Sequence, residues 1–178
     1  MCFRFLIILK HIQALISDSI IPFMVLLLAL PNCLSGCAEK SVPKIGKTPP
    51  AISCNDVNGE YIDLNRLKGN VVVIYFWSSS CCGERLKQLE PWFSLNKYTG
   101  LSILAVNVGD DENSVRLFAR NYGLTLNMLT DEHVMISRQY GIIGFPTIFI
   151  LDRNGVIRNK IVGDIDAAHL FKLVSRLL

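Results

Sequence analysis

Residues 71–92, "VVVIYFWSSSCCGERLKQLEPW", join a continuous apolar run to two adjacent cysteines and then to a helical pattern. The run Val71–Trp77 is rich in β-branched and aromatic residues, which is typical of a strand buried on both faces of a sheet. Beyond Cys82, apolar residues recur at helical spacing until Gly100 ends the pattern. Cys81 and Cys82 are therefore predicted to lie where a buried strand gives way to a helix.

This place in a fold favours thiol chemistry, because free N–H groups and the dipole of a helix N-terminus stabilise a thiolate. A partner sulfur one turn later would share the face of Cys81, but that position is Glu84. Adjacent residues of a regular helix do not face each other, and a Cys81–Cys82 disulfide would close a strained, easily reduced ring. Glu84 is either an acid that stabilises the helix start or a carboxylate that moves a proton during exchange.

The rest of the chain alternates strands and helices. Asn58-Gly59 predicts an N-terminal hairpin, and residues 101–109 form a second buried apolar run. A capped helix is expected over 111–123 and a short one over 133–140, followed by a hairpin that turns at 152–155 and an amphipathic helix to the C-terminus. This order predicts an α/β fold with a central mixed sheet covered by helices on both faces.

The N-terminal part has the organisation of a lipoprotein precursor. Residues 1–36 combine basic residues, a short apolar run and small residues, as a secretory signal peptide does. Leu34-Ser35-Gly36-Cys37 resembles the bacterial lipobox, so we expect Cys37 to be lipidated. Residues 37–50 then form a proline- and lysine-rich linker, and 51–178 form the globular domain.

The cysteine count argues against a disulfide framework. Of six cysteines, two fall in the signal peptide and one is the lipidated Cys37, which leaves Cys54, Cys81 and Cys82. We expect Cys54 to be a small core residue of the first hairpin. Two sulfurs without a third ligand fall short of a zinc site, so neither a metal nor another cofactor is expected. A net charge of +3 with no basic run gives no support for nucleic-acid binding.

Two phrases of the sequence together resemble a known family. Phe76-Trp77 followed by three serines and Cys81, with Gly144-Phe145-Pro146-Thr147 before the last hairpin, resemble the thioredoxin-like fold and, within it, the envelope thiol-disulfide oxidoreductases related to TlpA and ResA. The resemblance implies that Cys81 is the attacking cysteine and Pro146 a cis-proline, and that Phe145, Pro146 and Trp77 shape the substrate groove. The sequence departs from the family at Glu84, where the second cysteine is expected, and at Ser80, where a tryptophan is expected.

The resemblance implies a membrane-anchored enzyme that exchanges disulfides of envelope proteins through Cys81. Cys82 or an external thiol would resolve the mixed disulfide, an upstream thiol reductant would supply electrons, and cytochrome maturation proteins are among the implied clients. One alternative is a redox-inactive module that binds cysteine-containing clients. Another is a thiol peroxidase, which Ser78–Ser80 and Arg85 match only loosely. The expected location is the periplasmic side of the bacterial envelope, and the absence of an acidic residue at Ala38 favours the outer membrane.

Overall fold

A computed structural model describes residues 42–178, which belong to one compact unit. The predicted signal peptide over 1–36 and the predicted lipidation of Cys37 lie outside these residues. Within 42–178, no helix is both long enough and apolar enough to cross a bilayer.

The centre of the unit is a five-stranded mixed sheet in the order β5-β4-β3-β6-β7. Neighbouring strands β3, β4 and β5 are parallel, whereas β6 and β7 run antiparallel to their neighbours. The strands are β3 (Val71–Trp77), β4 (Leu101–Val108), β5 (Asn127–Asp131), β6 (Thr147–Leu151) and β7 (Ile157–Val162). The predicted mixed sheet is confirmed. Strand β5 was not predicted, because its five residues are too few and too polar at their ends to show a period.

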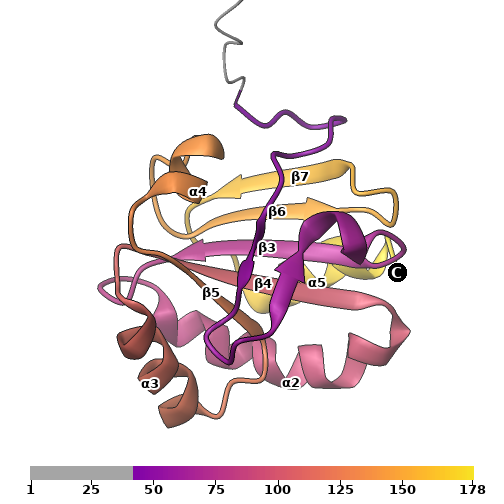
Figure 1. Cartoon of the computed structure of the whole chain (residues 1–178). Coiled ribbons are helices and arrows are strands. Elements are labelled where there is room, and N and C mark those ends of the chain that lie inside the picture. Colours follow the sequence, from indigo (N-terminus) through magenta and orange to yellow (C-terminus); the bar gives the residue numbers. More distant parts are fainter. Residues whose placement is uncertain (1–41) are drawn as a thin grey trace, which may run out of the picture. The chain divides into compact units, whose positions relative to one another are not determined.

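Three helices pack on one face of this sheet: α2 (Leu86–Asn96), α3 (Glu112–Tyr122) and α5 (Ala167–Ser175). Connections β3–α2–β4 and β4–α3–β5 advance in the same direction, so the right-handed crossover rule places α2 and α3 on the same face. The other face is covered by the hairpin of β1 (Ser53–Asn55) and β2 (Tyr61–Asp63), the 3-10 helix η1 (Leu64–Leu67) and α4 (Met135–Gln139). In Figure 1 the indigo hairpin crosses the front of the sheet and α5 lies behind it.

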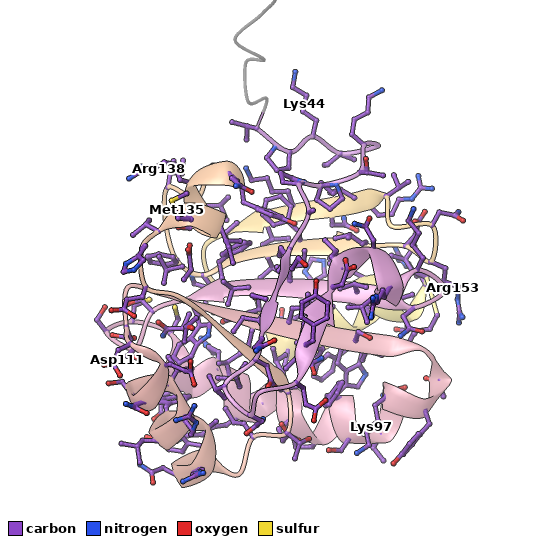
Figure 2. All side chains as sticks on the ribbon, in the orientation of Figure 1. Lys44, Lys97, Asp111, Met135, Arg138 and Arg153 are labelled. Atoms are coloured by element: carbon purple, nitrogen blue, oxygen red, sulfur yellow. The ribbon has the colours of Figure 1, made fainter. Side chains whose placement is uncertain are left out.

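Local sequence signals explain several element boundaries. The predicted first hairpin is confirmed, and its turn is held by Asp56, whose carboxylate accepts hydrogen bonds from the backbone N–H groups of Asn58 and Glu60 at 2.8 and 2.9 Å. Helix α3 begins where Asp111 accepts a hydrogen bond from the Ser114 N–H at 3.0 Å, at the position labelled in Figure 2. Both signals are residues that favour caps and turns over helix interiors.

The segment just before the first hairpin lies against the domain. Gly46 N–H donates to the Ile157 carbonyl at 2.8 Å, and Ile157 N–H donates to the Lys47 carbonyl at 3.0 Å, so this segment pairs with the start of edge strand β7. The buried Tyr140 hydroxyl donates to the Pro50 carbonyl at 2.7 Å. The described part of the predicted linker, 42–50, is thus an ordered part of the domain surface, where Lys44 projects outward (Figure 2).

Candidate active site

The two cysteines lie in a tight turn between β3 and α2. After Trp77 the chain reverses, and the N–H groups of Cys81 and Cys82 both donate to the Ser78 carbonyl at 3.2 Å. A short 3-10 helix, η2 (Gly83–Arg85), then leads into α2. Cys81 is exposed, whereas the Cys82 side chain is only 6% exposed and belongs to the core beneath. One sulfur therefore meets solvent and the other faces the interior.

The sulfurs of Cys81 and Cys82 converge, contrary to the expectation from a regular helix. Both Sγ atoms donate to the Ser78 carbonyl oxygen, at 3.8 and 3.9 Å. Side chains of adjacent residues diverge in a regular helix, but Cys81 and Cys82 precede the regular helix, which begins only at Leu86. The turn thus presents a vicinal pair of thiols around one backbone acceptor.

The surroundings make Cys82 a protonated thiol at neutral pH. Burial raises the pKa of Cys82 to about 12, with further contributions in the same direction from the neighbouring Cys81 side chain and from the negative charge of Asp164. The exposed sulfur is thus the one that can meet a partner molecule, while Cys82 holds a proton close to it.

Glu84 points toward α3. Its carboxylate accepts a hydrogen bond from Lys87 at 2.8 Å, and the Lys87 ammonium lies 3.6 Å from the centre of the Tyr122 ring. The hydrogen bond from Lys87 lowers the pKa of Glu84, so this group stays ionised. The contacts of Glu84 fit an acid at a helix start and give no support to its interpretation as a proton carrier for Cys81.

The predicted cis-proline is confirmed, since the Phe145–Pro146 peptide bond is cis. The register that pairs Phe76 with Thr147 places this bond and the cysteine turn at the same end of adjacent strands β3 and β6. Pro146 is buried, whereas Phe145 is 37% exposed and Ile143 is almost fully exposed. Ile143 and Phe145 are thus the apolar side chains that this loop presents to solvent.

Trp77 lies beneath the cysteine turn and does not reach the protein surface. Its indole is fully buried and packs against the Phe118 ring of α3, with the ring centres 4.8 Å apart. Trp77 can therefore affect the predicted substrate groove only by supporting the cysteine turn from below. Phe118 was not predicted to belong to the site; it lies within the helix that was predicted over 111–123.

Gly83 is the point where this aromatic pair meets the turn. A Cβ atom at residue 83 would lie 2.7 Å from the Phe118 ring and 2.9 Å from the Trp77 ring, both too close. We expect Gly83→Ala to lower the free energy of unfolding by about 1–3 kcal/mol, the usual cost of overpacking. Urea unfolding of Gly83→Ala and of Gly83→Ala/Phe118→Leu tests this. The second change should recover part of the loss, and equal stability of Gly83→Ala and the unmodified chain would contradict it.

Two polar contacts fasten the turn to other elements. The Ser79 hydroxyl donates to the Asp110 carboxylate at 2.5 Å, which also accepts from the buried Asn107 amide at 2.8 Å, so the turn is tied to the end of β4. On the opposite side, Arg85 forms an ion pair with Asp164 in the loop after β7. Asp110 and Asp164 were missed by sequence analysis, since no local pattern connects them to the cysteines.

Cys54 lies apart from the pair. Its half-buried side chain packs against the core on the hairpin side of the sheet, whereas Cys82 belongs to the core on the α2 side. Burial raises the pKa of Cys54, and the nearby Asp131 and Asp56 add to that effect. The structure therefore does not bring Cys54 to Cys81. Among residues 42–178, no group of three or more His, Cys, Asp or Glu side chains could hold a metal ion.

The chain is similar to known proteins in sequence and in structure. Residues 45–160 match the model of the AhpC/TSA family. The chain is 32% identical over 127 residues to the thiol-disulfide oxidoreductase ResA of Geobacillus kaustophilus. The aligned residues cover 70% of this chain and 73% of the relative. It is 30% identical over 129 residues to ResA of Bacillus anthracis, covering 71% and 75%. The thioredoxin domain of a thiol-disulfide oxidoreductase from Bacteroides vulgatus is similar in structure, with a TM-score of 0.63 and 26% identity over 74% of this chain and 98% of that one.

Proposed function

Because the chain belongs to the AhpC/TSA family, we propose that Cys81 and Cys82 are the redox centre of a thiol-disulfide oxidoreductase. The protein is a thiol-disulfide oxidoreductase of the ResA type, and enzymes of this kind act on client proteins that contain disulfides. The single observation that carries the assignment of residues is the convergence of one exposed and one buried sulfur on the Ser78 carbonyl.

In the reductive direction, the Cys81 thiolate attacks one sulfur of a client disulfide. A bond forms between Cys81 and that sulfur, the client's S–S bond breaks, and the leaving client sulfur takes up a proton. Cys82 then loses its proton and attacks the Cys81 sulfur, which forms a Cys81–Cys82 disulfide and releases the second client sulfur as a thiolate. Two electrons pass to the client, and an upstream thiol reductant returns them to the pair.

The turn geometry supports Cys82 as the resolving residue. A regular helix would hold the two side chains apart, but here both sulfurs contact the same carbonyl oxygen. A disulfide between adjacent residues closes a strained ring, and strain makes a disulfide easier to reduce. An upstream thiol reductant can therefore regenerate the dithiol form.

A redox titration tests this assignment. The full chain is equilibrated in glutathione buffers and its thiols are trapped. After digestion, the mass of the peptide that contains Cys81 and Cys82 is measured at each point. We expect a reversible loss of two hydrogens that disappears in both Cys81→Ser and Cys82→Ser, while Cys54 remains a thiol throughout. If the thiols of Cys54, Cys81 and Cys82 all stay free across the range, Cys82 is not the resolving residue.

The burial of Cys82 favours one second candidate, a module that holds clients covalently. A buried and protonated Cys82 attacks slowly, so a mixed disulfide on Cys81 would persist. In the titration, this candidate predicts a stable glutathione adduct on Cys81 and no Cys81–Cys82 disulfide.

The peroxidase alternative receives no support from the contacts of its candidate residues. The Ser78 and Ser80 hydroxyls are hydrogen-bonded to each other at 2.9 Å. The Arg85 guanidinium is paired with Asp164. Both groups are thus engaged with other partners and are not arranged to bind a peroxide at Cys81.

We further propose that the protein acts outside the cytoplasm, in the bacterial envelope, as a lipoprotein anchored through Cys37 and facing the periplasm. The lipobox-like sequence and the relation to ResA support this placement. Clients would be envelope proteins with disulfides or thiols, including proteins of cytochrome maturation. Metabolic labelling with a radioactive fatty acid should mark the full chain, and Cys37→Ala should abolish the label, whereas Cys33→Ala should not. Labelling that survives Cys37→Ala would contradict the anchor.

A further inference from the structure

The Ser79 side chain joins the cysteine turn to the end of the neighbouring strand. Its hydroxyl donates to the Asp110 carboxylate at 2.5 Å, although the two residues lie 31 positions apart. By contrast, the Ser78 and Ser80 hydroxyls are hydrogen-bonded to each other within the turn, at 2.9 Å. Ser79 is thus the serine of the turn that reaches the loop after β4.

The Asp110 carboxylate is held in place independently of Ser79. The Asn107 amide donates to the same carboxylate oxygen at 2.8 Å, and the Asp110 N–H donates to the Asn107 side-chain oxygen at 3.1 Å. Asn107 is fully buried near the end of β4 and pairs in register with Trp77, the last residue of β3. Because Asp110 is already ordered, Ser79 gains a charge-assisted hydrogen bond at a small cost in side-chain entropy.

This contact fixes the backbone that presents the acceptor for both thiols. The Ser78 carbonyl oxygen accepts the N–H groups of Cys81 and Cys82 at 3.2 Å and their sulfurs at 3.8 and 3.9 Å. That carbonyl belongs to the peptide that leads into Ser79, so a displacement of Ser79 displaces the oxygen as well. The hydrogen bond to Asp110 therefore keeps the acceptor beside the two thiols.

We propose that Asp110, acting through Ser79, is a positioning residue that holds the turn in its dithiol geometry and so raises the reduction potential of the Cys81–Cys82 pair. Oxidation joins the two sulfurs and removes two hydrogens, so the Ser78 oxygen loses both S–H donors. The ring between adjacent cysteines also requires the local backbone to change. A turn fixed by Asp110 relaxes less around that ring, which makes the disulfide easier to reduce. This inference rests on the proposed redox role of the pair.

A measurement of the reduction potential tests the inference. The full chain, with the four other cysteines changed to serine, is equilibrated with mixtures of reduced and oxidised glutathione. Each oxidised glutathione that reacts takes two hydrogens from Cys81 and Cys82, forms their disulfide and leaves as two reduced glutathione molecules. Thiol trapping and mass measurement give the fraction of each form, and therefore the equilibrium constant for oxidation by glutathione.

Ser79→Ala and Asp110→Ala each remove the contact and should favour the disulfide. We expect the equilibrium constant for oxidation to rise about threefold to tenfold in either variant, which lowers the reduction potential by about 15–30 mV. The double variant should match the single ones, because the same contact is lost only once. Asp110→Asn keeps an oxygen that can accept from Ser79 and Asn107, so its equilibrium constant should stay within about twofold of the unmodified pair.

Ser114→Ala is the matched control, since the Ser114 hydroxyl donates to the Asp111 carboxylate at 2.7 Å in an exposed contact at the start of α3. Its equilibrium constant should not change. An unchanged or lower constant in Ser79→Ala and Asp110→Ala would overturn the inference alone. A shift in Asp110→Asn as large as that in Asp110→Ala would also overturn it, because the effect would then belong to the charge. Absence of a Cys81–Cys82 disulfide in the unmodified pair at every glutathione ratio would overturn both the inference and the redox role of the pair.

Discussion

Changing Cys81 to serine should reduce the rate of disulfide exchange on the order of a thousandfold or more, to the background of the reductant alone. The exposed Cys81 sulfur is placed to reach a client disulfide, whereas Cys82 is buried below it. A serine hydroxyl in the same position is not ionised and is a poor nucleophile toward sulfur. The measurement is the reduction of a fluorescent peptide whose two halves are joined by a disulfide, with dithiothreitol as electron donor.

Changing Cys82 to serine should have a different effect. The variant still attacks through Cys81, so the peptide should accumulate as a mixed disulfide that intact mass detects, and turnover should then depend on the concentration of external thiol. Cys54→Ser is the matched control, because Cys54 lies on the other side of the sheet, and its turnover should equal that of the unmodified chain. Equal activity in Cys81→Ser and Cys54→Ser would remove Cys81 from the attacking role.

Trp77→Ala should produce the largest loss of stability, about 3–5 kcal/mol in the free energy of unfolding. The fully buried indole is among the largest side chains in the core, and it packs against Phe118 below Gly83. Removing it leaves a cavity under the cysteine turn. Urea unfolding followed by circular dichroism measures the change, with agreement between two spectroscopic probes to establish a two-state transition.

The control for this measurement is Leu95→Ala, since Leu95 lies on α2 and is 78% exposed. Its free energy of unfolding should stay within about 0.5 kcal/mol of the unmodified chain. A loss below about 1 kcal/mol in Trp77→Ala would mean that the core under the turn closes around the gap, contrary to the tight packing inferred for Gly83.

Much of the fold could be predicted because its signals are local. Val71–Trp77 is a long apolar run, and helix α3 has a capping aspartate at one end and a left-handed Gly123 at the other. The phrase around Pro146 predicted the cis bond. Strand β5 and the packing of residues 42–50 could not be predicted, because both depend on edges that distant strands supply: β4 pairs with β5, and Ile157 of β7 pairs with Gly46 and Lys47.

The candidate site was predicted less completely than the fold. Cys81 and Cys82 were predicted as the reactive residues but were expected to lie on a regular helix, whereas the turn at Ser78 brings both sulfurs to one carbonyl oxygen. Asp164 and Phe118 come from elements that follow other strands, and only the assembled sheet brings them to the turn. Spacing along a chain carries no signal for contacts of this kind.

The pairing of Gly46 and Lys47 with β7 has a consequence for how far the enzyme can travel. If Cys37 carries a lipid, nine residues separate it from Gly46, where the pairing begins, and these can span at most about 32 Å, whereas a free linker to Pro50 would allow about 45 Å. A lipid on Cys37 would therefore keep the domain close to the bilayer surface. The clients within its range would be proteins that emerge from the membrane or lie on it, and those that diffuse through the depth of the periplasm would have to come to the surface to be reduced.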